Sequence, residues 1–168
     1  AAAAAQTAGE FAARANAAVT AGDLEGAIRD ATEAIKLDGA NAAAFLVRGQ
    51  AYTKIVEKEK RPTWLPALGK LNPKSENAEK AISDLSRAIE LDPKNPIARA
   101  YRGLLYYFLN DLETALPDYK AAAELAKDNT WFKNTYDTVR KRLAGQFSAA
   151  GSELRNKAVR ISVAADKE

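Results

Sequence analysis

Cysteine, histidine and methionine are all absent from this chain of 168 residues. Without cysteine the protein has no disulfide bond, thiolate nucleophile or thiolate metal site, and without histidine it has no imidazole for catalysis or metal binding. The phosphate-binding motifs GxxxxGKS/T and GxGxxG are missing as well. Paired carboxylates stay open as catalytic groups, but the Asp and Glu residues lie where turns and exposed helical faces place them. We therefore expect no enzymatic activity, no cofactor and no metal ion.

Long apolar runs are also missing. None approaches the length of about 20 residues that a membrane-spanning helix needs, so we expect no transmembrane segment. Glycine and proline are sparse, with nine and six residues, whereas alanine is abundant. No run of β-branched residues alternates with polar residues in the way of a strand. Because this composition has a high helix propensity, it predicts an all-α fold.

The chain starts with an Ala-rich segment, residues 1–7, and has neither a methionine at position 1 nor an intact signal peptide. The alanine run fits three origins: the remainder after cleavage at a small-residue site, a frayed helical start, or residues added for expression. The missing methionine favours a processed or trimmed N-terminus. The sequence does not determine the compartment of this soluble protein, but it favours the bacterial periplasm or another exported compartment over the cytoplasm.

Basic residues concentrate toward the C-terminus. The formal net charge is +3, and the part from Thr130 onward holds eight of the 25 basic residues but only four of the 22 acidic ones. Such a cluster can contact phosphate or acidic lipid, although a solvated helix face is the more frequent explanation. No base-stacking platform accompanies it, so nucleic-acid binding is not the expected role.

The chain repeats itself with a period of 34 residues. Segments 78–96 and 112–129 align without a gap and match at Ala81 and Ala115, Ala88 and Ala122, and Leu91 and Leu125. An earlier copy at 24–41 places Ala27, Ala34 and Leu37 in the same roles, but 54 residues before the next copy. From Ala15 to Gly49 the offset is 34 residues, and from Gly49 to Gly103 it is 54. The second unit therefore carries an insertion, which lies at about residues 56–75.

This period and these residue types resemble the tetratricopeptide repeat family. The resemblance implies a right-handed superhelical solenoid of helix pairs, in which small residues let the two helices of a unit approach closely. Three units follow, at residues 8–41, 42–95 with the insertion 56–75, and 96–129. The small positions are Ala15, Gly49 and Gly103; Ala27, Ala81 and Ala115; and Ala34, Ala88 and Ala122. An ordinary helical bundle would show similar local stripes, but it has no reason to repeat at this period.

Turn residues agree with this division. Gly22-Asp23 and Asn110-Asp111 predict tight turns inside units one and three. Asp38-Gly39 and Asp92-Pro93 predict the ends of second helices, because glycine relieves a left-handed cap and proline cannot continue a helix. The sequence departs from the family pattern at Arg99 in place of an aromatic residue, Ala18 in place of a large one, and Lys127 in place of the closing proline.

Residues 130–168 follow the repeats. One helical face carries Phe132, Tyr136, Val139 and Leu143, which predicts a helix that covers the exposed end of the solenoid and that Gly145 can end. Beyond it lies a basic extension. A spacing of seven residues predicts a further helix there, through Phe147, Leu154 and Ile161.

The resemblance also implies a concave groove, lined by the first helices of successive units, that receives an extended or helical peptide. Its positions in this chain include Ala12 and Val19, and we predict partner contacts at Asn16, Leu46, Gln50, Thr53, Lys54, Ile97, Tyr101, Leu104, Tyr107 and Phe108. For Tyr107 and Phe108, contact with a ligand and packing under the C-terminal helices are equally favoured. Some family members grip the terminal carboxylate of chaperone tails in this groove. Only Asn16 keeps a suitable residue for that clamp, so we do not expect that function.

The insertion 56–75 is the feature that repeat packing does not require. It holds Trp64 and three leucines among prolines, with five basic residues against two acidic ones. Its first residues can extend the first helix of unit two. Trp64 either folds back onto the solenoid or forms a partner-binding hook, and we favour the hook because an exposed tryptophan is costly without a use.

Together these patterns predict a non-catalytic protein–protein interaction scaffold that binds a peptide or protein partner through the groove and the insertion. Two alternatives stay open. One is a self-assembling structural protein, which would be a homo-oligomer. The other is a basic adaptor for nucleic acid or an anionic membrane, which predicts salt-sensitive binding.

Overall fold

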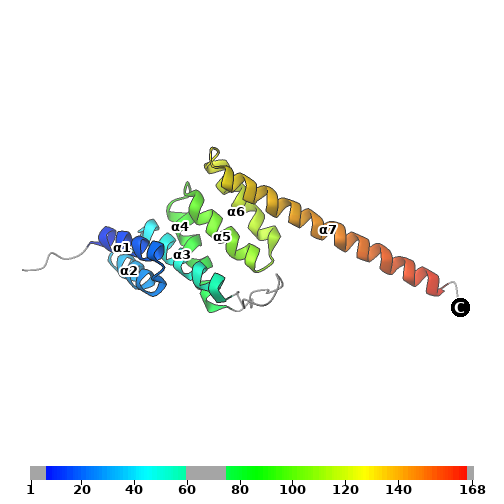
Figure 1. Cartoon of the computed structure of the whole chain (residues 1–168), viewed down its shortest axis with the longest axis horizontal. Coiled ribbons are helices and arrows are strands. Elements are labelled where there is room, and N and C mark those ends of the chain that lie inside the picture. The colour runs from blue at the N-terminus through cyan, green and yellow to red at the C-terminus, as the bar shows by residue number, and fades with distance from the viewer. Residues whose placement is uncertain (1–6, 60–74, 166–168) are drawn as a thin grey trace, which may run out of the picture.

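The computed structural model describes the backbone of residues 7–59 and 75–165, and the side chains of residues 7–58 and 75–153. The described residues form seven helices: α1 (Ala8–Ala21), α2 (Leu24–Leu37), α3 (Ala42–Glu59), α4 (Glu76–Leu91), α5 (Pro96–Phe108), α6 (Leu112–Leu125) and α7 (Thr130–Ala165). Helix α1 packs on α2, α3 on α4 and α5 on α6, and these pairs stack in order along the molecule (Figure 1). Helix α7 packs on α6 and then projects away from the stack. The predicted all-α solenoid of helix pairs is confirmed.

Two tight turns close the first and third pairs as predicted. Gly22 has the left-handed φ of 84° and its N–H donates to the carbonyls of Ala18 and Val19, so it ends α1. Asn110, the matching residue of the third pair, has a φ of 61°. The aspartates that follow, Asp23 and Asp111, cap the next helices with their side chains.

Gly39 was expected to adopt a left-handed conformation at the end of α2, and it does not. The helix stops at Leu37, and Asp38 takes an extended conformation with a φ of −142°. Of the described glycines, Gly22 alone has a positive φ, so Gly39 relieves no left-handed cap. Instead the Asp38 carboxylate accepts a hydrogen bond from the backbone N–H of Ala40 at 2.9 Å, which turns the chain locally.

Small residues set the spacing between the two helices of each pair. A Cβ atom added at Gly49 would lie 2.7 Å from Cγ of Leu85 on α4, which is closer than two carbon atoms pack. At Gly103 the added atom would lie 3.2 Å from the Tyr119 ring on α6. In the first pair, Ala15 and Ala27 are fully buried. The close approach implied by the family resemblance is therefore present in all three pairs.

A charged pair recurs inside every unit, and the sequence patterns above did not single it out. Arginines on the first helices bind buried aspartates on the second helices, in the pairs Arg14–Asp30, Arg48–Asp84 and Arg102–Asp118. In the second and third units the two carboxylate oxygens accept one hydrogen bond each from the guanidinium, at 2.7 and 2.8 Å. In the first unit, the hydrogen bond from Arg14 holds the pKa of the Asp30 carboxyl below its usual value, so that carboxyl stays ionised to a lower pH than an unpaired aspartate.

Two of these arginines also contact the preceding unit. Nη1 of Arg48 donates to the Thr32 hydroxyl on α2 at 3.1 Å, and Nη1 of Arg102 donates to the Ser86 hydroxyl on α4 at 3.0 Å. Each of these guanidinium groups therefore joins three helices from two successive units. The planar fork of arginine suits this arrangement, because its donors point in fixed directions.

The insertion begins inside a helix. Helix α3 continues to Glu59, which makes it 18 residues long against 14 for α1. Val56, the first residue assigned to the insertion, is fully buried against α4 and α5. The start of the predicted insertion thus extends α3, while Ser75 caps α4 by accepting from the N–H of Ala78. Residues 60–74, which include Trp64, lie outside the described residues.

Helix α7 differs from the two helices predicted after the repeats. It runs without a break from Thr130 to Ala165, through Gly145 and Gly151. An internal glycine costs a helix only about 1 kcal/mol relative to alanine, and nothing packs near Gly145 that would turn the chain there. The first turns of α7 pack as predicted, with Val139 buried against Leu112 and Tyr119 of α6. Within the described helices, no stretch has the length and apolar character that crossing a membrane requires.

Replacing Asp84 with Ala is expected to destabilise the protein by about 3 kcal/mol, because it removes the carboxylate partner of Arg48, whose side chain is only 21% exposed. The matched control is Glu90→Ala on the same helix. It removes an exposed ion pair with Arg87 and should change the free energy of unfolding by less than about 1 kcal/mol. Urea denaturation followed by circular dichroism measures both values. Equal effects of the two substitutions would contradict a structural role for the buried pair.

Candidate functional site

The first helices of the units line one side of the molecule, and α7 continues their series. Residues of α7 match residues of α5 at the repeat spacing of 34, so that Phe132 corresponds to Ala98 and Val139 to Leu105. All four of these residues are buried. Helix α7 therefore occupies the place of the first helix of a fourth unit, and it adds a further wall to the surface that α3 and α5 form.

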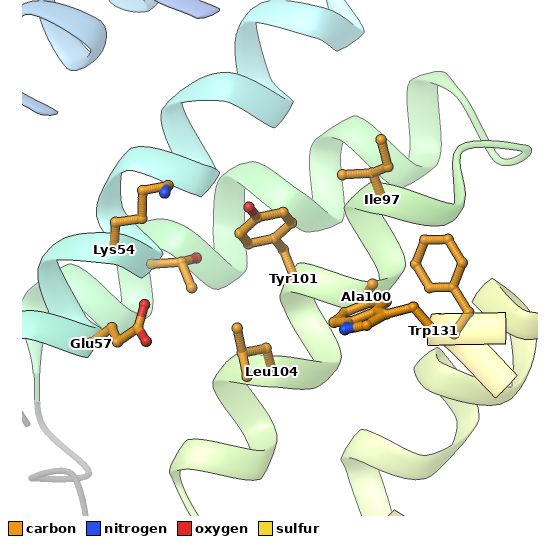
Figure 2. A pocket seen from close by; sticks show the side chains of 9 residues that line it. Lys54, Glu57, Ile97, Ala100, Tyr101, Leu104 and Trp131 are labelled. Carbon is orange, nitrogen blue, oxygen red and sulfur yellow. The ribbon is translucent and has the colours of Figure 1, made fainter. Parts of the chain in front are cut away.

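An apolar cavity of about 320 Å³ lies where α3, α5 and α7 meet. Figure 2 shows Lys54 and Glu57 on the α3 side, Trp131 on the opposite side, and Tyr101 and Leu104 of α5 between them. The full set of lining residues is Thr53, Lys54, Glu57, Ile97, Ala100, Tyr101, Leu104, Trp131 and Phe132. Two of the large side chains are well exposed, Ile97 at 43% and Trp131 at 57%.

Charge at this cavity is confined to one end. Lys54 and Glu57 lie three positions apart on the same face of α3, and neither forms an ion pair with any described residue. Burial, and secondly the negative charge of Glu57, raises the pKa of the Tyr101 phenol. Tyr101 is therefore a neutral hydroxyl that can donate a hydrogen bond within a largely apolar hollow.

Trp131 is the main residue of this site that the sequence patterns did not select. The carboxamide oxygen of Asn129 accepts from its backbone N–H at 3.0 Å and holds the first turn of α7 in place. The indole packs edge-on against the Phe132 ring, with centroids 5.1 Å apart. The signal for it was available, because Trp131 follows the predicted groove residue Ile97 by one repeat length.

The structure brings together five of the predicted contact residues, Thr53, Lys54, Ile97, Tyr101 and Leu104, which all line the cavity. Thr53 forms part of its floor, since it is buried and its hydroxyl donates to the carbonyl of Gly49 at 2.7 Å.

The other predicted contact residues lie elsewhere. Asn16 is exposed on α1 and Gln50 is half-buried on α3, and neither lines this cavity. Leu46 packs between the second and third units. Trp64 lies outside the described residues.

Tyr107 and Phe108, for which two readings were open, both pack within the protein. The Arg142 guanidinium of α7 lies 4.7 Å from the centre of the Tyr107 ring and donates a hydrogen bond to its hydroxyl. Phe108 packs against the buried cluster of Val56, Leu85 and Leu105. Tyr107 also borders a second hollow beside α7.

The residues at the carboxylate-clamp positions do not suit a carboxylate. Ala12 and Val47 are buried apolar side chains, while Ile97 and Tyr101 belong to the apolar cavity. Asn16 is left as a single polar group on α1. Among the described residues, these clamp positions therefore provide none of the cations that a terminal carboxylate needs.

Stacked helix pairs with a surface formed by their first helices define a helical-repeat protein. A family model described as a TPR repeat matches residues 74–109, and two described as tetratricopeptide repeats match residues 12–57 and 102–129. The chain belongs to the tetratricopeptide repeat family. In a comparison with curated protein sequences, none matches this chain.

Solved tetratricopeptide domains share the fold. The second domain of Spaghetti (RPAP3), solved with the HSP90 peptide SRMEEVD, is 31% identical with a TM-score of 0.56, over 71% of this chain and 93% of that one. The first domain of the same protein, also solved with that peptide, is 23% identical with a TM-score of 0.66, over 83% and 97%. The OM64 domain of Arabidopsis is 25% identical with a TM-score of 0.65, over 81% and 96%.

The apolar character of the cavity can be tested with the fluorescent dye 1-anilinonaphthalene-8-sulfonate. In a Trp64→Phe background, Trp131 is the one tryptophan left. We expect native protein to enhance the dye emission, since the dye gains emission in apolar hollows. We also expect the bound dye to quench the fluorescence of Trp131. Ile97→Lys should reduce the enhancement severalfold.

The matched control is Leu37→Lys, which changes an aliphatic residue that is 58% exposed on α2, outside the cavity. This variant should keep the dye signal of the parent. If both lysine substitutions lowered the signal equally, dye binding would not report on the cavity.

Proposed function

We propose that this protein is a scaffold that binds a peptide segment of a partner protein in the groove between α3, α5 and α7. The observation that carries the proposal is the apolar cavity at which these three helices meet. Exposed Ile97 and Trp131 border it, and large apolar side chains that stay exposed beside a hollow are typical of a binding surface. The proposed role is binding, with no chemical step.

The physical basis is the burial of a partner's apolar side chain on a preformed surface. Removing one Leu- or Phe-sized side chain from water contributes about 2 kcal/mol. Tyr101 and Trp131 lose little conformational freedom on binding, because aromatic side chains have few rotatable bonds and Trp131 already packs on Phe132. Lys54 and Glu57 offer polar contacts at one end, which can fix the direction of the bound segment.

The similar Spaghetti domains support a peptide ligand, because they were solved with a peptide bound. Their acidic HSP90 tail is not the ligand we propose here, since the clamp positions hold Ala12, Val47, Ile97 and Tyr101. Trp64 and the insertion 56–75 stay a predicted second contact surface next to the groove. An exported compartment and self-assembly also stay predictions.

A photo-crosslinking residue at position 97 tests the proposal. Benzoylphenylalanine in place of Ile97 should crosslink to a discrete partner segment in cells of the source organism, and the same residue in place of Leu37 should not. Mass spectrometry identifies the crosslinked segment, which is then synthesised as a peptide. Its affinity for the protein should fall about tenfold or more with Tyr101→Ala, the loss expected when an apolar contact is removed.

Three other outcomes would count against this function. The same crosslinks from positions 97 and 37 would indicate nonspecific contact. Crosslinks only between copies of the chain would favour the self-assembling protein. Equal affinity of the synthetic peptide for the protein and its Tyr101→Ala variant would show that the segment binds elsewhere.

A further inference from the structure

A second hollow lies on the other side of Trp131. It measures about 390 Å³ and shares Trp131 and Leu104 with the first cavity. Its remaining walls include Tyr107 of α5, Tyr119 of α6, and Asn134 and Thr138 of α7. The two hollows therefore adjoin along α5, and the half-exposed indole of Trp131 stands as a ridge between them.

The second hollow is apolar at its base. Tyr119 and Val139 are both nearly inaccessible to solvent, at 2% and 1%. Burial raises the pKa of the Tyr119 phenol, with smaller contributions from Tyr107 and Asp118, so this ring stays neutral. An apolar side chain placed here would contact the Trp131 indole on one side and the Tyr107 ring on the other.

One polar group at the rim is available to a peptide backbone. The hydroxyls of Thr135 and Thr138 already donate to the carbonyls of Trp131 and Asn134, at 2.8 Å each. The Asn134 side-chain amide is exposed and forms no hydrogen bond with any other described residue. An amide offers both a donor and an acceptor, which is the pattern that pairs with a peptide group.

Lys54 and Glu57 offset each other at the α3 end of the double hollow, whereas positive charge prevails at its α7 end. Lys54 lies at the α3 end, and on α7 the exposed Lys141 follows Thr138 by one helical turn. Arg142 adds a further cation beside Tyr107. Among the described residues bordering these hollows, Glu57 is the single opposing charge, because Asp137 on α7 pairs with Arg140 at 3.2 Å. An acidic segment therefore matches this surface better than a basic one.

We propose that the bound partner is an acidic internal peptide segment with two apolar side chains that lie on opposite sides of Trp131. This inference rests on the function proposed above and specifies its ligand. One apolar side chain enters the cavity beside Tyr101 and the other enters the hollow beside Tyr107, while Asn134 pairs with the peptide group between them. A free C-terminal carboxylate is not required, because the described residues at the clamp positions do not suit one.

A displayed library of random short peptides, with both ends fused or blocked, is the probe. Selection on the full chain should enrich peptides that carry two apolar residues a few positions apart and flanking Asp or Glu residues. The best peptide is then synthesised with an amidated C-terminus, and its affinity is measured by fluorescence anisotropy.

Three variants separate the two hollows. Thr138→Trp fills the second hollow and should weaken binding about tenfold, which corresponds to about 1.4 kcal/mol. In this variant, the second apolar residue of the peptide should no longer increase the affinity. Thr20→Trp is the matched control, since Thr20 is likewise exposed and donates to the carbonyl four residues before it, but lies on α1. Ile97→Lys should abolish binding through the first cavity.

Each remaining outcome overturns a defined claim. Enriched peptides with one apolar residue, or equal binding by the protein and Thr138→Trp, would refute the second subsite and leave the proposed function intact. Binding that appears only when the same peptide is synthesised with a free C-terminal carboxylate would refute the internal segment. Failure to enrich any peptide, or binding unchanged by Ile97→Lys, would refute the proposed function itself.

Discussion

The close contact between the two helices of each unit is the constraint on which the rest of the structure depends. A Cβ atom at Gly49 would overlap Leu85, and one at Gly103 would crowd the Tyr119 ring, so the helices of these pairs lie at a closely defined distance. A fixed distance within each pair determines where the next pair stacks. The walls of the groove follow from that spacing, because α3, α5 and α7 are held apart by the second helices behind them.

The arginine–aspartate pairs add direction to this close packing. Helices that contact each other only through alanines could slide along one another. The Arg48 guanidinium binds two carboxylate oxygens and a hydroxyl of the preceding unit, and it can do so in only one arrangement of the three helices. Charges this poorly exposed contribute little net stability, since their desolvation offsets much of their attraction. Their effect is mainly on the geometry. In the third unit, Lys120 occupies the position that corresponds to Thr32 and Ser86, so this unit has no hydroxyl there for an arginine of the next helix. The series of contacts between units therefore ends before α7, which differs from a full unit.

Sequence patterns predicted the repeats, the small positions and two of the turns because one period governs all of them. The same period also contains Arg14, Arg48 and Arg102, but arginine is ordinarily a surface residue and its burial depends on a partner in another helix. The three predicted units end at residue 129 and so leave out Trp131, although the repeat spacing continues for one more helix. Gly145 was assigned to a helix end because a lone glycine lowers helix propensity, yet helix ends need a competing interaction that is absent here. The cavity itself follows from side-chain sizes on three helices that are distant in the sequence.

The unbroken course of α7 joins the groove to a long arm. A helix of 36 residues spans about 54 Å at 1.5 Å per residue, and only its first turns lie against the repeats (Figure 1). Trp131 stands on the first turn of this same helix. A partner held beside Trp131 and a structure attached near the far end of α7 would keep a set separation and orientation, as two objects on one stiff rod. The length of α7 would then set the distance between the two attachment points.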